Sequence, residues 1–495
     1  MLRLLQLICI TLLSITNTFA APNHPTIGKP IQYDFTYDNH SNPPTLKVSL
    51  IFHGNTEGKT TIELPDNVAG ITELYKNISH LTTTGATLDK TDKPNVYSLS
   101  YKPNDLITIT YDVTQGWEGP PVKATQFRAP ILQNEYFQFK GRSVLIYPKY
   151  YANEKQFPVT LKWHLPPSWV IANSYDTKQT HQQLVTNMIY LSESLFLGGD
   201  YRLTQIPVEG GTIWTSIRGS WHFTDKDFNQ TVKKIILTER NFWNDHYFPY
   251  YLVNLIPIGT VCKSQGGTGL NQSFTAFMGS DCVIGHGTLW LIAHEYFHTW
   301  NKPSRFMLKP DEKQDRYYAW FTEGFTNYYA GLFLLKSDLI SFEEYINNYN
   351  RIIKAYYTSP AIDSTITDVQ KKFWKNHDVQ LIPYEQGEII AHNWNAIIKQ
   401  QSGNKKSLDN LMKALINTKT PKLSLQQMNQ IAEKFMKPGI MADVDKINQG
   451  QRIEPNSNSL GPCVNQTMQD NIPQFTLNKP MWDKQRKQCL AWFFS

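Results

Sequence analysis

The N-terminal part of the chain, from residue 33 to residue 202, alternates apolar and polar positions with a period of two. Apolar side chains occupy every second position of three stretches, at 46–52, 107–113 and 159–165. Because successive side chains of a strand point to opposite faces of a sheet, each stretch predicts a strand with one buried face. Turn signals such as Asn42-Pro43-Pro44 separate the strands. We therefore expect an antiparallel β-sandwich domain over residues 21–205.

The pattern changes after Gly198-Gly199-Asp200, where helical and strand-like segments begin to alternate. Their spacing predicts, in chain order, a strand at 213–217, a helix at 225–243 and strands at 251–258 and 273–278. The next run starts near Leu289 and is apolar on all sides, so it predicts a buried helix that ends before Pro303. We expect residues 206–335 to form a second domain.

The remaining chain is predicted to be mainly helical. Residues 336–437 have the pattern of amphipathic helices, with boundaries near Ser359-Pro360 and Pro383. The tail, residues 438–495, is polar and has little periodicity. Taken together, the segments predict a multidomain α+β protein with a β-rich start and a helical C-terminal domain.

The first 20 residues have the pattern of a secretory signal peptide. Arg3 precedes the apolar run 4–13, and small residues end the segment at Phe19-Ala20-Ala21, which predicts cleavage after Ala20. A transmembrane anchor is the alternative, but this apolar run is short for one, and no other stretch approaches roughly 20 apolar residues. We expect a secreted or periplasmic protein with no transmembrane anchor in the mature chain.

Composition narrows the choice of partners. The formal net charge of +6 is small for 495 residues, and the lysines are scattered instead of forming a basic stripe with interleaved aromatics. Such a chain is not expected to bind nucleic acid.

Four cysteines remain once the signal segment with Cys9 is removed: Cys262, Cys282, Cys463 and Cys489. An even number in an oxidising compartment predicts disulfides. Of the three possible pairings, proximity in sequence favours Cys262 with Cys282 and Cys463 with Cys489. Free buried thiols are the alternative.

Candidate chemistry lies in the buried helix, which contains the pentad His294-Glu295-Tyr296-Phe297-His298. Residues four apart share one face of a helix, so the two imidazoles can converge on one tetrahedral zinc ion with Glu295 beside them. This HExxH spacing is typical of zinc metallohydrolases, and a chance match is the alternative.

A two-histidine site needs a third ligand from elsewhere in the chain. Glu323 is a lone carboxylate within the mostly apolar run 320–329, and buried carboxylates are rarely left unpaired. Glu323 is therefore the best-placed third ligand, with a structural salt bridge as the alternative.

A glycine-rich segment, 265–271, precedes the last predicted strand. It lacks the Lys-Ser/Thr ending of a phosphate-binding loop and leads into a strand instead of a helix. We interpret it as a loop or an ordinary hairpin.

Three segments carry a family resemblance: 294–301 (His-Glu-Tyr-Phe-His-Thr-Trp-Asn), 320–326 (Trp-Phe-Thr-Glu-Gly-Phe-Thr) and 384–387 (Tyr-Glu-Gln-Gly). They resemble the signatures of metallopeptidase family 61, the glycyl aminopeptidases, which are gluzincins. The resemblance implies a β-rich domain, a thermolysin-like catalytic domain and a helical domain. It also implies that His294, His298 and Glu323 bind zinc, that Glu295 is the general base and that Tyr384 stabilises the oxyanion. A core tyrosine is the alternative for Tyr384.

The chain departs from this family in two places. The resemblance implies a substrate-binding loop at Gly267, Gly269, Leu270 and Asn271, but Asn271 stands where the family often has glutamate. Many members end in a PDZ domain, and residues 438–495 are too few to form one.

The sequence therefore predicts an exported zinc peptidase with one Zn²⁺ per chain. A zinc-activated water would attack a peptide bond with Glu295 as general base, and the family resemblance favours an aminopeptidase acting on a peptide or protein. A zinc endopeptidase is one alternative. A catalytically silent peptide-binding protein on the same fold is another, although it would have no need for Glu295.

Overall fold

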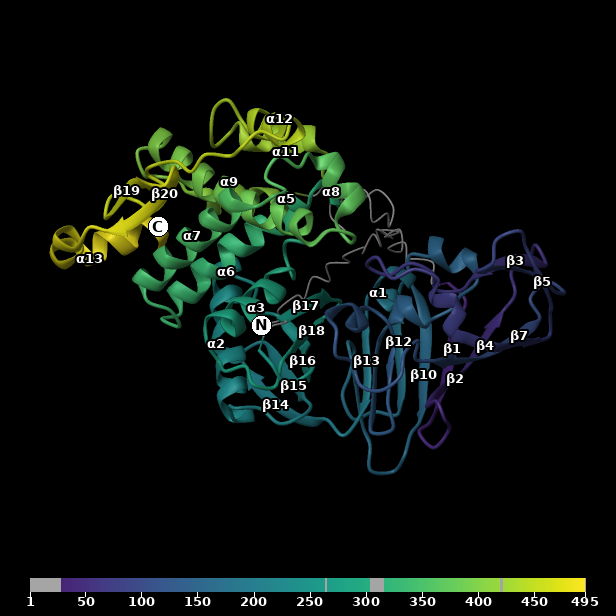
Figure 1. Ribbon diagram of the computed structural model, residues 1–495. Coiled ribbons are helices and arrows are strands. Elements are labelled where there is room, and N and C mark those ends of the chain that lie inside the picture. The colour runs from purple at the N-terminus through teal and green to yellow at the C-terminus, as the bar shows by residue number, and fades with distance from the viewer. Residues whose placement is uncertain (1–27, 263–264, 303–315, 419–421, 495) are drawn as a thin grey trace, which may run out of the picture.

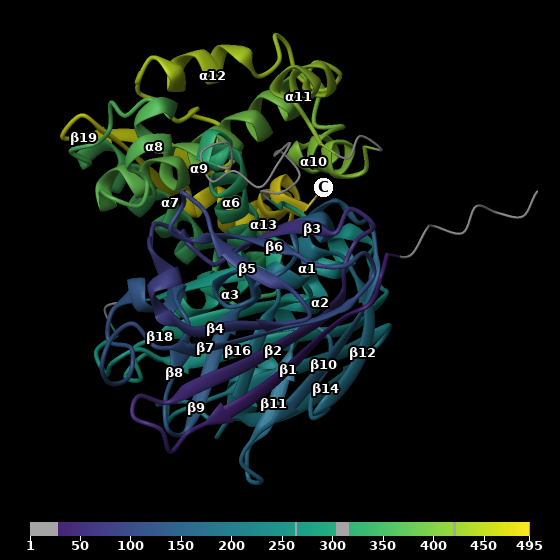
Figure 2. The same cartoon turned by 90° about the vertical axis from the view of Figure 1, so that its right-hand side faces the viewer.

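The computed structural model describes residues 28–262, 265–302, 316–418 and 422–494 of the chain (Figure 1). The predicted signal segment 1–20 and Pro303 lie outside the described residues. The chain has a β-rich N-terminal part and a helical C-terminal part, with a mixed sheet and helix segment between them, so the α+β fold is confirmed. In the view of Figure 2 the helical part lies above the sheets.

The N-terminal part contains two large sheets and a small one. The first sheet has the order β12-β10-β1-β2-β7-β4. Its strands are β1 (Ile31–Asp38), β2 (Thr45–His53), β4 (Ile78–Thr84), β7 (Leu106–Thr114), β10 (Phe157–His164) and β12 (His181–Thr186). The second has the order β11-β13-β9-β8, with β8 (Ile131–Leu132), β9 (Tyr136–Lys140), β11 (Val170–Asn173) and β13 (Leu195–Gly199). The small one has the order β3-β6-β5, with β3 (Lys59–Glu63), β5 (Thr87–Lys90) and β6 (Val96–Ser100).

The two large sheets pack face to face through an aromatic core. Phe35 of β1 stacks on Trp163 of β10 with ring centroids 4.1 Å apart, and Phe139 of β9 reaches both rings from the opposite sheet. The expected sandwich is therefore present, but the prediction of a purely antiparallel one was wrong. β1 pairs with β10 in parallel, because the long connection between them lets the chain cross over before it returns.

The middle segment is a five-stranded sheet with the order β14-β15-β16-β18-β17. Its strands are β14 (Arg202–Val208), β15 (Gly211–Ile217), β16 (Phe248–Pro257), β17 (Gln265–Leu270) and β18 (Ser273–Met278). The glycine-rich segment that we interpreted as a loop or an ordinary hairpin is the first strand of a hairpin, β17, paired antiparallel with β18 at the edge of the sheet. Its glycines carry no strand signal, which is why the sequence pattern concealed it.

Both faces of this sheet are covered. Helices α2 (Asp225–Trp243) and α3 (His286–Phe297) pack on one face, against Tyr251 and Val253 of β16. The other face meets the N-terminal part, where Leu252 and Ile256 pack with Phe127. Burial on both sides explains why β16 is apolar throughout instead of alternating. The arrangement places α3 between the sheet and the helical part.

The helical part consists of α5 (Ala319–Thr322), α6 (Gly324–Lys336), α7 (Phe342–Thr358), α8 (Ile366–Lys372), α9 (His377–Gln401), α10 (Leu408–Ile416), α11 (Leu425–Ala432) and α12 (Met441–Asn448). The boundary near Ser359-Pro360 is present, since α7 ends at Thr358. The boundary near Pro383 was wrong, because α9 continues through this proline. Buried residues on both sides, such as Ile382 and Ile389, hold the helix in the core despite the missing hydrogen bond.

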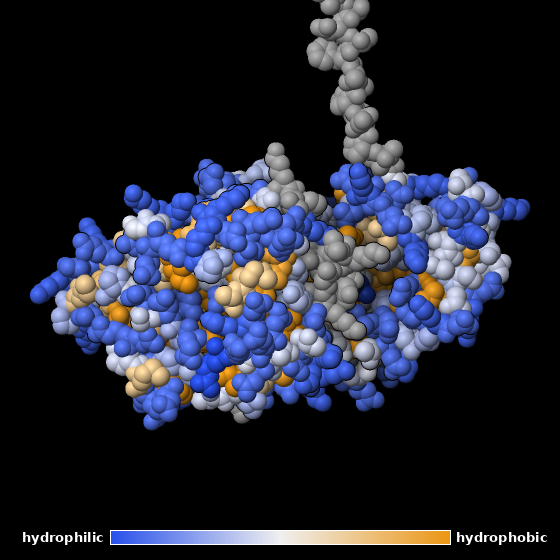
Figure 3. All heavy atoms as spheres, turned by 90° about the horizontal axis from the view of Figure 1, so that it is seen from above, coloured by the Kyte–Doolittle hydropathy of each residue, from blue (hydrophilic) through white to orange (hydrophobic). Residues whose placement is uncertain are grey.

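The polar tail is ordered against this helical part. After α12 it forms the hairpin β19 (Val464–Gln469) and β20 (Ile472–Leu477), followed by α13 (Lys479–Phe494). The side chain of Asn350 on α7 makes hydrogen bonds of 2.8 Å to both the N–H and the carbonyl of Phe475, and a disulfide joins Cys463 to Cys489. No helix in the part of the chain that the structure describes is long and apolar enough to cross a membrane. The face drawn in Figure 3 is mostly hydrophilic.

Candidate metal centre

Helix α3 and the residue that follows it carry the first two predicted ligands. It begins at His286 and ends at Phe297, so His298 lies in the next turn, but its backbone stays in the α region (φ −60°, ψ −10°). The spacing of four residues therefore still places His294 and His298 on the same side, with ring centroids 4.9 Å apart. His294 and Glu295 are only 8% and 7% exposed.

The structure brings Glu323 to these two histidines. Glu323 lies between α5 and α6, and its Oε2 is 3.3 Å from Nε2 of His294 and 3.5 Å from Nε2 of His298. The two Nε2 atoms are 3.2 Å apart. Zinc bonds of about 2.0 to 2.1 Å in a tetrahedron give ligand separations of about 3.3 to 3.4 Å. The three atoms thus form a triangle that fits one face of a zinc tetrahedron.

Both imidazoles are held in the tautomer that metal binding needs. Nδ1 of His298 faces the carbonyl oxygen of Asn301 at 3.2 Å, and Nδ1 of His294 faces Oδ1 of Asn327 at 2.8 Å. An oxygen acceptor at Nδ1 keeps the proton there and leaves the lone pair of Nε2 directed at the shared triangle.

Asn301 also joins the two ligand segments. Its buried Nδ2 group lies 3.2 Å from the carbonyl oxygen of Phe321, 3.3 Å from that of Thr322 and 3.1 Å from Oγ1 of Thr326. One side chain thus fixes the turn after α3 to the residues that flank Glu323. Sequence reasoning assigned no role to Asn301 or Asn327, although Asn301 belongs to the first family motif.

The charges of the centre depend on one another. Burial opposes ionisation of Glu323, but the two imidazoles outweigh it and hold the pKa of its carboxyl well below the ordinary value. Burial also opposes a charge on His298, but Glu323 outweighs it and raises the pKa of that imidazole to about 9. Binding of a metal would therefore release a proton from this cluster.

The predicted general base lies against the edge strand β17. A Cβ atom on Gly267 would come within 2.6 Å of Oε1 of Glu295, and one on Gly269 would come within 2.9 Å of Cβ of His298. Glycine is needed at both positions because the strand runs directly over the helix. Burial raises the pKa of Glu295 above its ordinary value, although His294 and His298 lower it.

Tyr384 of α9 reaches the centre from the helical part. Its ring stacks on that of His294 with centroids 5.9 Å apart. Burial, followed by the nearby carboxylate of Glu323, raises the pKa of Tyr384 well above the ordinary value, so the hydroxyl keeps its proton. The close approach depends on Gly387, where a Cβ atom would come within 1.9 Å of the carbonyl oxygen of Trp320. The three family motifs therefore meet at one place.

Comparison with known protein families agrees with the geometry of this centre. The M61 glycyl aminopeptidases match residues 287–410, the segment that contains the two histidines, Glu295, Glu323 and Tyr384. The predicted resemblance to metallopeptidase family 61 is confirmed. With the possible metal site formed by His294, His298 and Glu323, this match supports a zinc metallopeptidase.

Solved structures of family 1 peptidases and their relatives share the fold over most of the chain. An aminopeptidase N family protein from Idiomarina loihiensis is 20% identical, with 89% of this chain and 80% of that chain covered and a TM-score of 0.72. An M1 zinc metallopeptidase from Deinococcus radiodurans is 12% identical, with 87% of this chain and 95% of that chain covered and a TM-score of 0.55. Yeast LTA4 hydrolase in complex with bestatin is 15% identical, with 86% of this chain and 68% of that chain covered and a TM-score of 0.52. No curated protein matches the chain.

The end of the segment that we expected to form a substrate loop contacts the N-terminal part of the chain. Leu270 packs against the apolar cluster that lies between the middle sheet and the N-terminal part. The backbone N–H of Asn271 donates to the carbonyl oxygen of Glu193 at 2.8 Å. Of the four residues expected to line the loop, Gly267 and Gly269 lie against Glu295 and His298.

The start of β17 is fixed by a disulfide between Cys262 and Cys282. Nε2 of Gln265 lies 3.3 Å from the sulfur of Cys262 and 3.4 Å from that of Cys282. The same side chain lies against the first turn of α3, where a Cβ atom on Gly287 would come within 2.9 Å of its oxygen. The disulfide and Gln265 therefore connect the edge strand to the beginning of α3.

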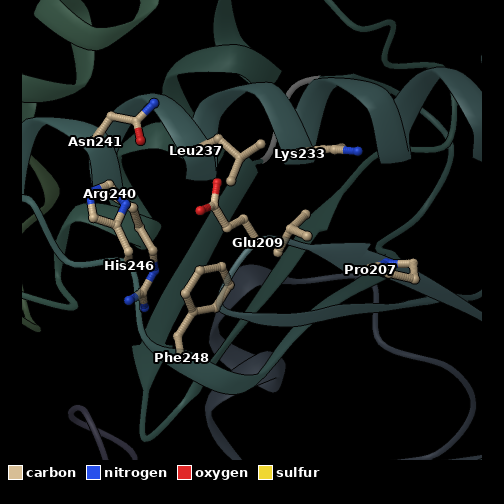
Figure 4. Close-up of a pocket in the computed structure, with 9 residues that line it drawn as sticks. Pro207, Glu209, Lys233, Leu237, Arg240, Asn241, His246 and Phe248 are labelled. Atoms are coloured by element: carbon tan, nitrogen blue, oxygen red, sulfur yellow. The ribbon is translucent and has the colours of Figure 1, made fainter.

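A separate surface cavity, drawn in Figure 4, lies beside α2. Lys233, Arg240 and Asn241 of α2 line it together with Glu209 and His246. None of its lining residues belongs to the candidate centre, so it has no part in the chemistry described above.

Proposed function

We propose that the protein is a zinc-dependent metallopeptidase that acts as an aminopeptidase, with Glu295 as general base. One observation carries this proposal. Two imidazole nitrogens and a carboxylate oxygen, separated by 3.2 to 3.5 Å, lie beside a buried glutamate and an edge strand.

The donor set fits zinc. His294, His298 and Glu323 would hold one Zn²⁺, because imidazole and carboxylate ligands in this number leave the fourth position for water or substrate. A bound zinc ion supplies Lewis acidity, which lowers the pKa of water towards neutrality and polarises a carbonyl group.

The protein's own groups would handle the protons and the developing charge. Glu295 would take a proton from the attacking water and return it to the leaving amine. Tyr384 would donate a hydrogen bond to the oxygen of the scissile carbonyl as it gains negative charge. Loss of one such donor typically costs about 2.7 to 4 kcal/mol of transition-state stabilisation.

The substrate would lie along β17. This strand is at the edge of its sheet, so one side of its backbone is open to pair with an extended peptide. Its glycines allow that peptide to lie close to Glu295, because no side chain stands between them.

The proposed organisation follows the family. A thermolysin-like catalytic domain would occupy residues 206–335, between a β-rich domain at 21–205 and a helical domain at 336–437, with the tail at 438–495. Cleavage of residues 1–20 would release the mature protein into the periplasm or the medium. The two disulfides support an oxidising compartment.

The proposal is tested by measuring zinc content together with hydrolysis of a peptide library, in which each peptide has either a free or an acetylated amino terminus. We expect one zinc per chain and preferential cleavage of the first peptide bond. Glu323→Ala should lose both zinc and hydrolysis. Zinc without any hydrolysis would favour the silent peptide-binding protein, and cleavage of internal bonds regardless of acetylation would favour an endopeptidase.

A further inference from the structure

A buried lysine from the N-terminal part lies next to the proposed substrate strand. Lys140 is the last residue of β9 and is only 4% exposed. Its Nζ group donates a 2.8 Å hydrogen bond to Oγ1 of Thr268, which lies between Gly267 and Gly269 on β17. Lysine is almost never this buried unless it is paired, so its position needs an explanation.

The part of the chain that the structure describes provides no counter-ion for this amine. Glu193, an acid outside the metal centre that favours the charge on Lys140, is itself held by Arg142 at 3.3 Å. Within the described residues Lys140 has no carboxylate within ion-pair distance, and the bond to Thr268 is the one hydrogen bond its amine makes. Two of its three donors therefore make no hydrogen bond within the described residues, although Nζ also lies 5.6 Å from the centroid of the Phe127 ring. A buried ammonium in this state gains stability when an anion reaches it.

The electrostatic surroundings agree with this description. Glu193 and Glu295 favour the charge on Lys140, but burial and then Arg142 outweigh them and lower the pKa of the amine to about 7. Arg128 also opposes the charge. Lys140 is hydrogen-bonded to Thr268, and the adjacent Gly267 lies against Glu295, so the amine is close to the proposed catalytic base.

We propose that Lys140 is a specificity-determining residue, which binds a carboxylate group of a peptide lying along β17. This inference rests on the proposed peptidase function and names its substrate class: peptides with an acidic side chain or a terminal carboxylate close to the cleaved bond. Lys140 approaches the edge strand from the N-terminal part. Its charge would therefore repel a substrate ammonium group at the position where the carboxylate binds.

A purely structural role makes a different prediction. If Lys140 only joins β9 to β17 through Thr268, its loss would lower kcat/KM equally for all substrates. A role in recognition requires that its loss changes the ratio between charged and neutral substrates.

The test uses amidated peptides that differ only by Asp or Asn at each position around the cleaved bond, and a second set that differs only by a free or amidated carboxyl terminus. We expect the wild type to favour the carboxylate member of one set by roughly tenfold in kcat/KM, the factor for one charge-assisted hydrogen bond. A preference within the first set would mean that Lys140 binds a side-chain carboxylate, and a preference within the second set would mean that it binds the carboxyl terminus. Lys140→Met should bring the ratio close to one, and Lys140→Arg should retain part of it. Lys90→Met, on the exposed end of β5, is the matched control and should leave the ratio unchanged.

Binding gives a second readout, because Glu295→Gln can be titrated with the same peptides without turnover. The inferred role is wrong if the wild type does not distinguish the two members of either set, or if Lys140→Met keeps the ratio. A protein with full zinc that cleaves no peptide would instead overturn the proposed function. In that case the binding ratio on Glu295→Gln, with and without Lys140→Met, still decides the role of Lys140.

Discussion

Nδ1 of His294 lies 2.8 Å from Oδ1 of Asn327, a residue one turn beyond Glu323 at the start of α6. The backbone N–H of Asn327 in turn donates to the carbonyl oxygen of Glu323 at 2.9 Å. Helix α6 and the residue that precedes it therefore supply both a proposed ligand and the group that orients another. Burial raises the pKa of Glu388 to about 8, and a hydrogen bond from the side chain of Asn327 opposes this rise.

Asn327→Leu should weaken zinc binding about 10- to 100-fold, the usual effect of removing the partner of a ligating histidine. Competition with a chelator of known affinity measures the change. Asn327→Asp, which keeps an oxygen at the same place, should retain most of the affinity. Equal zinc affinity in Asn327→Leu and the wild type would show that His294 needs no orienting partner.

Glu295→Gln should keep zinc, because none of the three proposed ligands is altered, and should lower peptide hydrolysis by several orders of magnitude. The amide fills the same space against Gly267 but cannot accept a proton. Zinc content and turnover are measured on the same preparation. A variant that keeps more than roughly a tenth of wild-type turnover would exclude Glu295 as general base.

Local spacing explains which residues of this centre could be predicted from the sequence. His294, Glu295 and His298 follow from helix geometry, since their relation is set within five residues. Glu323 stood out because a lone carboxylate in an apolar run needs a partner. The strands at 46–52, 107–113 and 159–165 also follow from their alternation, and the structure has all three.

Contacts between distant segments explain what the sequence did not provide. Asn301 acts on residues 20 to 25 positions away, and Lys140 meets Thr268 across 128 positions. No periodicity encodes such contacts. Strand β17 was missed for a different reason, because the glycines that let it lie against Glu295 are residues that local propensity assigns to loops.

Tyr384→Phe should lower turnover far more than substrate affinity, because the proposed hydrogen bond exists mainly in the transition state. The expected loss is about 2.7 to 4 kcal/mol, or roughly a hundred- to a thousandfold in kcat. Steady-state kinetics at full zinc occupancy measure it. An unchanged kcat would make Tyr384 a packing residue against His294.

Replacement of both Cys262 and Cys282 by alanine should lower stability by about 3 kcal/mol, the loop-entropy value for a separation of 20 residues. It should also lower kcat/KM, because the disulfide fixes Gln265 at the start of β17. Replacement of Cys463 and Cys489 is the matched control, since that disulfide lies in the tail and should affect stability alone. Equal kinetic effects of the two double variants would argue against a role of the first disulfide in positioning β17.

The charge on Lys140 should make substrate preference depend on pH. Burial and Arg142 lower the pKa of Lys140 to about 7, so the amine is charged below that pH and neutral above it. The preference for a carboxylate peptide over its amide should therefore be present at low pH and decline as the pH rises through about 7. The ratio of kcat/KM for a matched pair is the quantity to measure, because titration of Glu295 and of the metal centre affects both peptides and largely cancels.

The same shift has a consequence for stability that does not involve a substrate. Because the folded pKa of Lys140 lies below the ordinary value near 10.5, the unfolded chain binds more protons between about pH 7 and pH 10.5. The contribution of Lys140 to the free energy of unfolding should therefore rise with pH across this window. Lys140→Met removes the contribution. In denaturant unfolding, the free energy of unfolding of the wild type should therefore increase relative to that of the variant as the pH rises. Parallel stability profiles for the two proteins would mean that Lys140 keeps an ordinary pKa, and the pH-dependent preference should then be absent as well.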